Sequence, residues 1–348
     1  QCQTGNHPLR IAQHFQSQQQ VEATMTKAIR IHEHGGPEVC SYDDIDIGAP
    51  GEGQVRLKHT AIGVNYLDIY HRSGAHKIDN LPVPIGMEGA GVVTEVGPGV
   101  DDLKVGDRVC YHALMGSYTE ERLAPAARLI PIPDGIDDKI AASMMMKGMT
   151  AEYLIMRCYP VKSGDTVLVH AAAGGVGTII CQWLKHIGAT VIGTVSTDAK
   201  VNLAKSQGCD HVIVSSKETV SERVKEITDG KGVPVVYDGI GKDTFDDSLD
   251  CLSPRGYMVS FGNSSGTVEP VRLAKLVSHG SAYLTRPTIA TYCASREDLL
   301  MSANALFDVV KAGHVKIPAP VEYALSDCAQ SHTDLESRKT TGSLILIP

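Results

Sequence analysis

The sequence lacks any pair of cysteines separated by only two residues. Its nine cysteines are scattered along 348 residues, and an odd, unclustered set argues against a disulfide framework and against a zinc knuckle. We therefore expect reduced thiols in a cytoplasmic protein. No apolar run approaches the length of a membrane span. No basic block stands out in a chain with a formal net charge of −8, which argues against a nucleic-acid partner.

The N-terminal segment, residues 1–24, is rich in glutamine and differs in character from the rest of the chain. It has neither the apolar core of a signal peptide nor the cationic amphipathic face of a transit peptide. Met25 resembles a natural start, so we interpret residues 1–24 as an extension and assign them no function. The remaining length is sufficient for two domains.

Two patterns divide the rest of the chain. From Lys27 to about Lys147, short strands separated by Gly- and Pro-containing turns predict an all-β module. After Thr150, apolar strands such as TVLVH, TVIGTV and PVVYDGI alternate with helical stretches, which predicts a parallel, doubly wound sheet. The tail predicts helices around 296–312 and near 326–338, followed by the closing strand GSLILIP.

A glycine-rich turn, VLVHAAAGGVGTI, links the first of these strands to a helix. The helix carries an apolar stripe from Val176 to Ile187 and is expected to end at Gly188. The pattern is that of a dinucleotide-binding loop, although Ala172 stands where the fingerprint has its first glycine. Gly174 would allow the backbone to approach a diphosphate, and Gly177 would allow close packing of helix and strand. The alternative is a tight turn without a ligand.

The residues after the second strand favour NADPH over NADH. NAD-binding proteins usually have an acidic residue at this strand end, but the sequence here is TVSTDAK. Ser196 is small and uncharged, Lys200 follows, and Asp198 lies too late to reach the ribose. A lysine without a nearby acid suits the 2′-phosphate of NADPH. Alternatively, Lys200 is a solvated helix-surface lysine.

A β module followed by this nucleotide-binding pattern resembles the medium-chain dehydrogenase/reductase superfamily over residues 27–348. The resemblance implies an α/β fold with a GroES-like catalytic domain (25–150 and 288–348) and a Rossmann NADPH-binding domain (151–287). Zinc-dependent members have a histidine in the motif that reads GMEGAG here, and a cysteine in the stretch that reads GVNYLD. Met87 and Asn65 occupy these two positions. The sequence therefore predicts no metal.

A set of segments narrows the resemblance within the zinc-free branch: in order, AIGVNYLDIYHRSG, KGMTAEYL, HAAAGGVG, VVYDGIGKDTF, MVSFGNSSG and ESRKTTGSLILIP. With these segments the chain is similar to the zeta-crystallin-like NADPH:quinone oxidoreductases. It implies a homodimer joined through the strand SAYLTR. It also implies a set of cofactor-binding residues: Asn65, Tyr153, Gly174, Gly175, Val176, Gly177, Ser196, Lys200, Ser215, Ile240, Phe261, Gly262, Asn263, Ser264 and Arg338.

Two positions depart from this group. Ser215 replaces a tyrosine expected near the 2′-phosphate, but its hydroxyl can still bind phosphate. His76 replaces the tyrosine of RSG-x-Y, which resembles a proton donor in related enoyl thioester reductases. His76 could donate a proton instead, although an exposed loop histidine is the favoured interpretation. Asn65, Asp68 and Tyr70 are the other candidates for the substrate pocket, and Asp68 could simply fix its own loop.

The expected function is zinc-independent hydride transfer from NADPH to a quinone. Hydride chemistry belongs to the cofactor, so the protein has to supply orientation and exclusion of water. Reduction of α,β-unsaturated ketones or aldehydes is the alternative within enzymes, because it needs the same hydride. A crystallin-like or RNA-binding role is the alternative of another class, and the negative charge and glycine loop argue against it.

Overall fold

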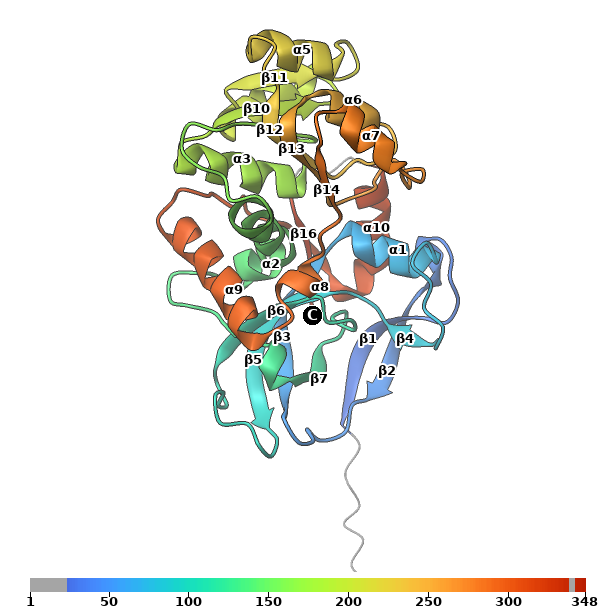
Figure 1. Cartoon of the computed structure of the whole chain (residues 1–348). Coiled ribbons are helices and arrows are strands. Elements are labelled where there is room, and N and C mark those ends of the chain that lie inside the picture. Colours follow the sequence, from blue (N-terminus) through green and yellow to red (C-terminus); the bar gives the residue numbers. More distant parts are fainter. Residues whose placement is uncertain (1–23, 338–341) are drawn as a thin grey trace, which may run out of the picture.

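A six-stranded parallel sheet forms the upper part of the molecule in the computed structural model, which describes residues 24–337 and 342–348 (Figure 1). Its strand order is β11–β10–β9–β12–β13–β14. The strands are β9 (Thr166–Val169), β10 (Thr190–Val195), β11 (His211–Val214), β12 (Val233–Asp238), β13 (Leu252–Ser260) and β14 (Tyr283–Thr285). This is the order of a doubly wound dinucleotide-binding sheet, so the predicted parallel sheet is confirmed.

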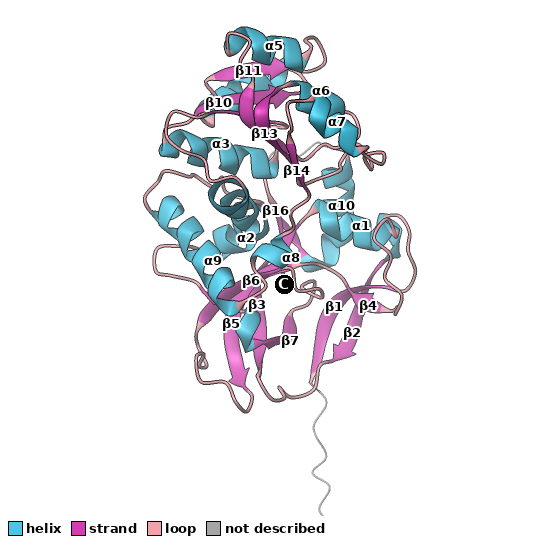
Figure 2. Cartoon of the chain, in the orientation of Figure 1, coloured by secondary structure: helices cyan, strands magenta, loops and turns pink. Residues whose placement is uncertain are grey.

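Both faces of this sheet are covered. In β9, Val167 and Val169 belong to one apolar cluster and Leu168 to another, because side chains alternate across a strand. Helices lie in the crossovers between the strands (Figure 2): α3 (Gly175–Ile187), α4 (Val201–Ser206), α5 (Val220–Ile227), α6 (Phe245–Asp250) and α7 (Leu273–Ser278). Helix α3 ends at Gly188, whose φ of 91° is left-handed, as its sequence predicted.

The lower part of the molecule is β-rich and contains two sheets. A three-stranded sheet has the order β2–β1–β4, and a seven-stranded sheet has the order β15–β16–β3–β5–β6–β8 with β7 paired to β3. The strands are β1 (Met25–Ile31), β2 (Cys40–Asp46), β3 (Gln54–Val64), β4 (Val83–Pro84), β5 (Glu88–Val96), β6 (Arg108–His112), β7 (Glu121–Pro125), β8 (Ile130–Pro131), β15 (Val321–Ala324) and β16 (Leu344–Ile347).

The tail of the chain returns to this β-rich part. Strand β16 pairs antiparallel with β3, where Leu344 lies opposite Val64, and β15 pairs in parallel with β16. The tail also supplies α8 (Ile289–Tyr292), α9 (Arg296–Lys311) and α10 (Cys328–Glu336), so the two helices expected there are confirmed. The expected domain limits at residues 150 and 288 stay a prediction.

The prediction of an all-β module up to about residue 147 is wrong in two places. Helix α1 (Tyr66–Ser73) follows β3, and α2 (Asp138–Glu152) begins before the predicted change of pattern. Local capping explains α1: Asn65 is its N-cap in extended conformation, Asp68 lies in its first turn, and Gly74 ends it with a φ of 83°. In α2, the Asp137 side chain accepts a hydrogen bond from the Lys139 amide.

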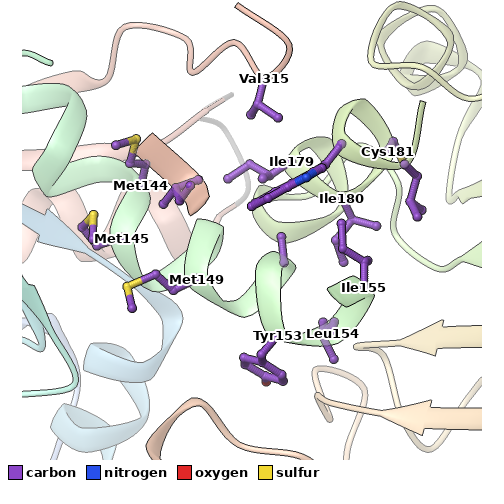
Figure 3. Close-up of a cluster of buried hydrophobic side chains, with 14 of the residues drawn as sticks. Met144, Met145, Met149, Tyr153, Leu154, Ile155, Ile179, Ile180, Cys181 and Val315 are labelled. Atoms are coloured by element: carbon purple, nitrogen blue, oxygen red, sulfur yellow. The ribbon is translucent and has the colours of Figure 1, made fainter. Parts of the chain in front are cut away.

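The largest apolar cluster joins the two parts of the molecule. Met144, Met145 and Met149 of α2 lie in the same cluster as Ile179 and Ile180 of α3 (Figure 3). Within the residues that the structure describes, no helix combines the length and apolar character needed to cross a membrane.

Candidate nucleotide and substrate site

The turn between β9 and α3 explains why alanine replaces the first glycine of the fingerprint. Ala172 is fully buried, and its amide donates to the Thr194 carbonyl of β10 at 2.9 Å. A Cβ on Gly193, the neighbouring residue, would lie 2.7 Å from the Ala172 Cβ. The missing side chain at 193 therefore leaves the space that the Ala172 methyl fills. The left-handed residue of the turn is Ala171, with a φ of 51°.

Gly177 supplies the close approach between helix and turn. A Cβ on Gly177 would lie 2.3 Å from the Ala171 carbonyl oxygen and 2.9 Å from the Ala172 Cα, and both are backbone atoms. Gly175 lies close to the Lys147 side chain of α2: a Cβ on Gly175 would be 3.0 Å from the Lys147 Cδ. Gly174 is the N-cap of α3, and Val176 packs against the core at its edge. The first amides of α3 thus lie at a helix N-terminus suited to an anion.

A pocket of about 130 Å³ opens beside this turn. It brings together five of the predicted cofactor residues. Gly174 comes from the glycine loop, Ser196 follows β10, and Lys200 ends the 3₁₀ turn η4 (Asp198–Lys200). Ser215 follows β11, and Ile240 follows β12. Ala171, Ala173, Thr194 and Val195 complete the lining. In the part of the chain that the structure describes, the lining contains a lysine and no acidic residue.

Asp198 is held away from the role that an NAD-binding acid would have. Its carboxylate forms an ion pair with Lys217, and both side chains are exposed. The Ser215 hydroxyl donates to the Val195 carbonyl at 3.2 Å, which orients Ser215 at the end of β11. Lys200 is therefore the charged side chain of this pocket lining, and its contact with a 2′-phosphate stays a prediction.

Four further predicted cofactor residues, Phe261, Gly262, Asn263 and Ser264, follow one another in the loop after β13. A Cβ on Gly262 would lie 2.4 Å from the Gly239 carbonyl oxygen, so the backbones after β12 and β13 touch. The Phe261 ring lies against Gly239, and Arg286 donates to the Gly262 carbonyl at 2.8 Å. Asn263 and Ser264 continue this loop, in which the Ser264 amide reaches the Gly239 carbonyl at 3.4 Å.

The predicted cofactor residue Tyr153 is not part of the lining of this pocket. Tyr153 is only 2 % exposed and its ring stacks on Tyr292, with centroids 4.7 Å apart. It begins a six-residue π-helical turn, Tyr153–Cys158, and Figure 3 shows it at the edge of the core. Its contact with a cofactor stays a prediction. Arg338 lies outside the described residues.

Asn65 and Glu88 connect α1, β5 and α2 where zinc-dependent relatives would bind metal. The Asn65 side-chain amide donates to one Glu88 carboxylate oxygen at 2.8 Å, and the Met146 amide donates to the other at 2.7 Å. Glu88 is fully buried, and burial raises the pKa of its carboxyl. Met87 precedes it and adds only a thioether. A hydrogen-bonded carboxylate thus lies beside Asn65.

Asp68 is a second buried acid near Asn65. It is fully buried, and burial raises the pKa of its carboxyl to about 7. One carboxylate oxygen accepts from the Asn65 amide at 2.8 Å and from the Tyr118 hydroxyl at 3.0 Å. The other oxygen, Oδ1, has no hydrogen-bond partner among the described residues. Asp68 therefore fixes its own turn, as one expectation had it, and is also able to hold a proton near neutral pH.

A chain of buried donors leads to Asp68. Arg72 Nη1 lies 3.1 Å from His332 Nδ1, and His332 Nε2 lies 3.0 Å from the Tyr118 hydroxyl. A guanidinium only donates, so Nδ1 accepts and the proton is on Nε2. Tyr118 then accepts from His332 and donates to Asp68. Sequence reasoning missed Tyr118 and His332, because they come from a loop and a helix 214 residues apart.

Tyr70 and His76 form a small aromatic group at the end of α1. Their ring centroids lie 5.3 Å apart, and His71 lies 5.9 Å from His76. Burial, followed by the nearby His76, lowers the pKa of His71. His76 itself is exposed, so the interpretation as an exposed loop histidine fits its position.

Comparisons with known proteins agree with this architecture. Residues 51–161 match the model of the alcohol dehydrogenase GroES-like domain, and residues 175–296 match that of the zinc-binding dehydrogenase family. A quinone oxidoreductase of Pseudomonas aeruginosa is 46 % identical over 325 residues, covering 93 % of this chain and 100 % of that protein. A 2-haloacrylate reductase of a Burkholderia species is 46 % identical over 331 residues, covering 93 % and 99 %.

A solved structure resembles this one closely. The crystal structure of Escherichia coli quinone oxidoreductase complexed with NADPH has a TM-score of 0.89 and 44 % identity, covering 92 % of this chain and 100 % of that one. Several such proteins are this similar over nearly their full length, and this similarity shows the family of the chain. The chain belongs to the quinone oxidoreductases of the medium-chain dehydrogenase/reductase superfamily.

Proposed function

We propose that this protein is an NADPH-dependent quinone reductase that works without zinc. The observation that carries the cofactor assignment is the pocket beside the glycine loop, where Lys200 and two serines meet and none of the described lining residues is an acid. The similar Escherichia coli enzyme was solved with NADPH. The proposal places the diphosphate at the start of α3, where Gly174 leaves room for it, and the 2′-phosphate between Lys200 and Ser215.

Bound NADPH would supply a hydride to the acceptor. The residues near Asn65 would set the acceptor's position: Asn65 is fixed by Glu88, and α1 is fixed at its first turn by Asp68. Reduction of a quinone by a hydride leaves an oxygen anion that needs one proton. Solvent can supply this proton.

Reduction of a conjugated carboxylate is the second candidate reaction. The 2-haloacrylate reductase is as similar to this chain as the Pseudomonas quinone oxidoreductase, at 46 % identity. An acrylate carries a negative charge that a quinone lacks, so its binding requires a cation in the acceptor pocket. Lys147 does not meet this requirement, because it lies against Gly175, where the proposal places the diphosphate, and donates to the Ser343 hydroxyl at 2.9 Å. A crystallin-like or RNA-binding role has no comparable support at a net charge of −8.

We also propose that the protein is a cytoplasmic homodimer. Strand β14 lies at the edge of its sheet and pairs only with β13 among the described residues. An uncovered edge is a liability in a soluble protein. Exposed apolar side chains adjoin this edge: Leu273 and Val277 of α7 are 79 % and 70 % exposed, and Tyr283 of β14 is 52 % exposed. A twofold pairing through β14 would cover them.

The test is a comparison of acceptors at saturating NADPH. We expect turnover of 1,4-benzoquinone and 9,10-phenanthrenequinone with a kcat/KM well above that for 2-chloroacrylate and a simple enone. A reversed order would assign the protein to the second candidate. Absence of NADPH oxidation with every acceptor, from protein that binds NADPH, would reject both reactions and leave a binding role.

A further inference from the structure

Two cysteines far apart in the sequence meet beside the buried donor chain. Cys40 is the first residue of β2, and Cys328 is the first residue of α10. The Cys328 thiol donates to the Cys40 sulfur at 3.8 Å, across a sequence separation of 288 residues. Disulfide sulfurs lie about 2.05 Å apart, so a small approach of these two side chains suffices for a bond.

The two thiols have different environments. Cys40 is half-buried, whereas Cys328 is fully buried. The hydrogen bond from Cys328 lowers the pKa of the Cys40 thiol, and the nearby Arg72 guanidinium lowers it further against the effect of burial. Burial raises the pKa of Cys328. Cys40 therefore has the character of an attacking thiolate, and Cys328 that of a resolving thiol.

We propose that Cys40 and Cys328 are a site of reversible oxidation that forms a disulfide when the protein meets hydrogen peroxide. The Cys40 thiolate attacks one peroxide oxygen, the O–O bond breaks, and water leaves after one proton is taken up. Cys40 is then a sulfenic acid. The Cys328 sulfur attacks the Cys40 sulfur, the S–O bond breaks, and a second water leaves. Two thiols have lost two electrons and two protons to one peroxide.

The same sulfurs and His332 also form a group with metal-ligand chemistry, since their donor atoms lie within 4.8 Å of one another. The hydrogen bonds argue against a metal there. His332 Nδ1 accepts from Arg72, and Nε2 donates to Tyr118, so both ring nitrogens are engaged. A cation would have to displace one of these partners and sit beside the buried guanidinium of Arg72.

A second cysteine pair shows that distance alone does not create such a site. Cys181 and Cys209 lie 3.5 Å apart, closer than the proposed pair. Both are buried, and the hydrogen bond that Cys181 shares with Cys209, followed by burial, raises the pKa of Cys181 well above its ordinary value. Gly193 also lies against Cys209, because a Cβ there would be 2.5 Å from its sulfur. This pair therefore serves as an internal control.

Oxidation would act on the helix that carries His332. Cys328 and His332 are four residues apart, which places them on the same face of α10. A disulfide would fix the first turn of α10 to β2, next to the hydrogen bonds that end at Asp68. Because the bond closes a loop of 288 residues, it also restricts the unfolded chain strongly.

The experiment treats reduced full-length protein with stoichiometric hydrogen peroxide, blocks free thiols, and maps peptides by mass spectrometry. We expect a peptide pair linked through Cys40 and Cys328 that dithiothreitol releases, and a melting temperature raised by a few degrees in the oxidised protein. Cys40→Ala and Cys328→Ala should abolish both effects, whereas Cys209→Ala should keep them. In Cys328→Ala, a sulfenic-acid probe should label Cys40.

Three results would overturn the proposal. The first is oxidation of Cys40 to the sulfinic acid in wild-type protein without a link to Cys328. The second is linkage of Cys181 to Cys209 at an equal or greater rate. The third is zinc retained by the reduced wild-type protein and lost in Cys328→Ala, which would make the group a metal site. None of these readouts depends on the reaction that the enzyme catalyses.

Discussion

Replacing Asp68 by asparagine tests the protonation state of the buried carboxyl beside Asn65. The pKa of Asp68 rises from 3.8 to about 7 because the group is fully buried. The difference between these two pKa values corresponds to about 4 kcal/mol of free energy, since one pKa unit is about 1.36 kcal/mol. A raised acid pKa means that the folded protein prefers the protonated form. Its stability contribution is complete below pH 3.8 and is lost as the pH rises through 7.

Asparagine has nearly the shape of the protonated acid but cannot ionise. The free energy of unfolding of Asp68→Asn, relative to wild type, should therefore rise between pH 4 and pH 8 by about 4 kcal/mol. Other titrating groups contribute equally to both proteins and cancel in the difference. Below pH 4 the asparagine should be neutral or slightly unfavourable, because its NH₂ group replaces the oxygen that has no partner.

Urea unfolding at a series of pH values, with the slope m checked for constancy, measures this difference. Asp79→Asn is the matched control for loss of one carboxylate, since the Asp79 side chain is 81 % exposed. A stability difference for Asp68→Asn that stays flat from pH 4 to pH 8 would refute the reasoning. It would mean that the donors from Asn65 and Tyr118 keep the carboxylate ionised throughout.

The remaining predictions concern the cofactor, the metal, the Glu88 carboxylate and the assembly. Lys200→Ala should lower kcat/KM for NADPH about ten- to a hundredfold and leave kcat/KM for NADH nearly unchanged, because a charge-assisted contact contributes about 1.5–3 kcal/mol. Lys205→Ala is the control, and equal losses for both cofactors would contradict the prediction. Purified protein should hold no stoichiometric zinc by metal analysis and should keep its activity in chelator. Glu88→Gln should lower the free energy of unfolding by about 1–3 kcal/mol, since the amide places an NH₂ group against a donor; an unchanged urea midpoint would contradict this. Light scattering at micromolar concentration should give a dimer, and Tyr283→Lys in β14 should shift it toward monomer.

The nucleotide-binding half of the fold could be predicted because its signals are local. The stripe of α3 and its terminal Gly188 lie within one helix, and the strand runs of the parallel sheet are apolar on both faces. Lys200 was predicted from the residues that follow the second strand, whereas Ser215 was predicted only from the family resemblance. The structure brings both into one pocket lining, because the carboxyl ends of adjacent parallel strands meet at one edge of the sheet.

Helix α1 and the donor chain to Asp68 could not be predicted in the same way. The stretch before α1 reads as a strand, and the helix depends on caps at Asn65 and Gly74 rather than on a long apolar stripe. The neighbours of Asp68 come from separate elements: Tyr118 precedes β7, and His332 belongs to α10. No spacing in the sequence links a loop tyrosine to a histidine of the tail.

The compensation between Ala172 and Gly193 shows how the fingerprint can change without loss of the site. The turn needs a small residue at 172 because the next strand passes close to it, and the Ala172 amide bonds to the carbonyl of Thr194. A methyl at 172 is tolerated because position 193 has none, and a Cβ at both positions would bring them within 2.7 Å. Gly177 has no such freedom, since a Cβ there would meet backbone atoms that cannot move aside. The loop therefore has glycine where a Cβ would meet backbone, and alanine where the facing residue, Gly193, has no side chain. The turn can keep its close contact with the helix although one glycine of the fingerprint is absent.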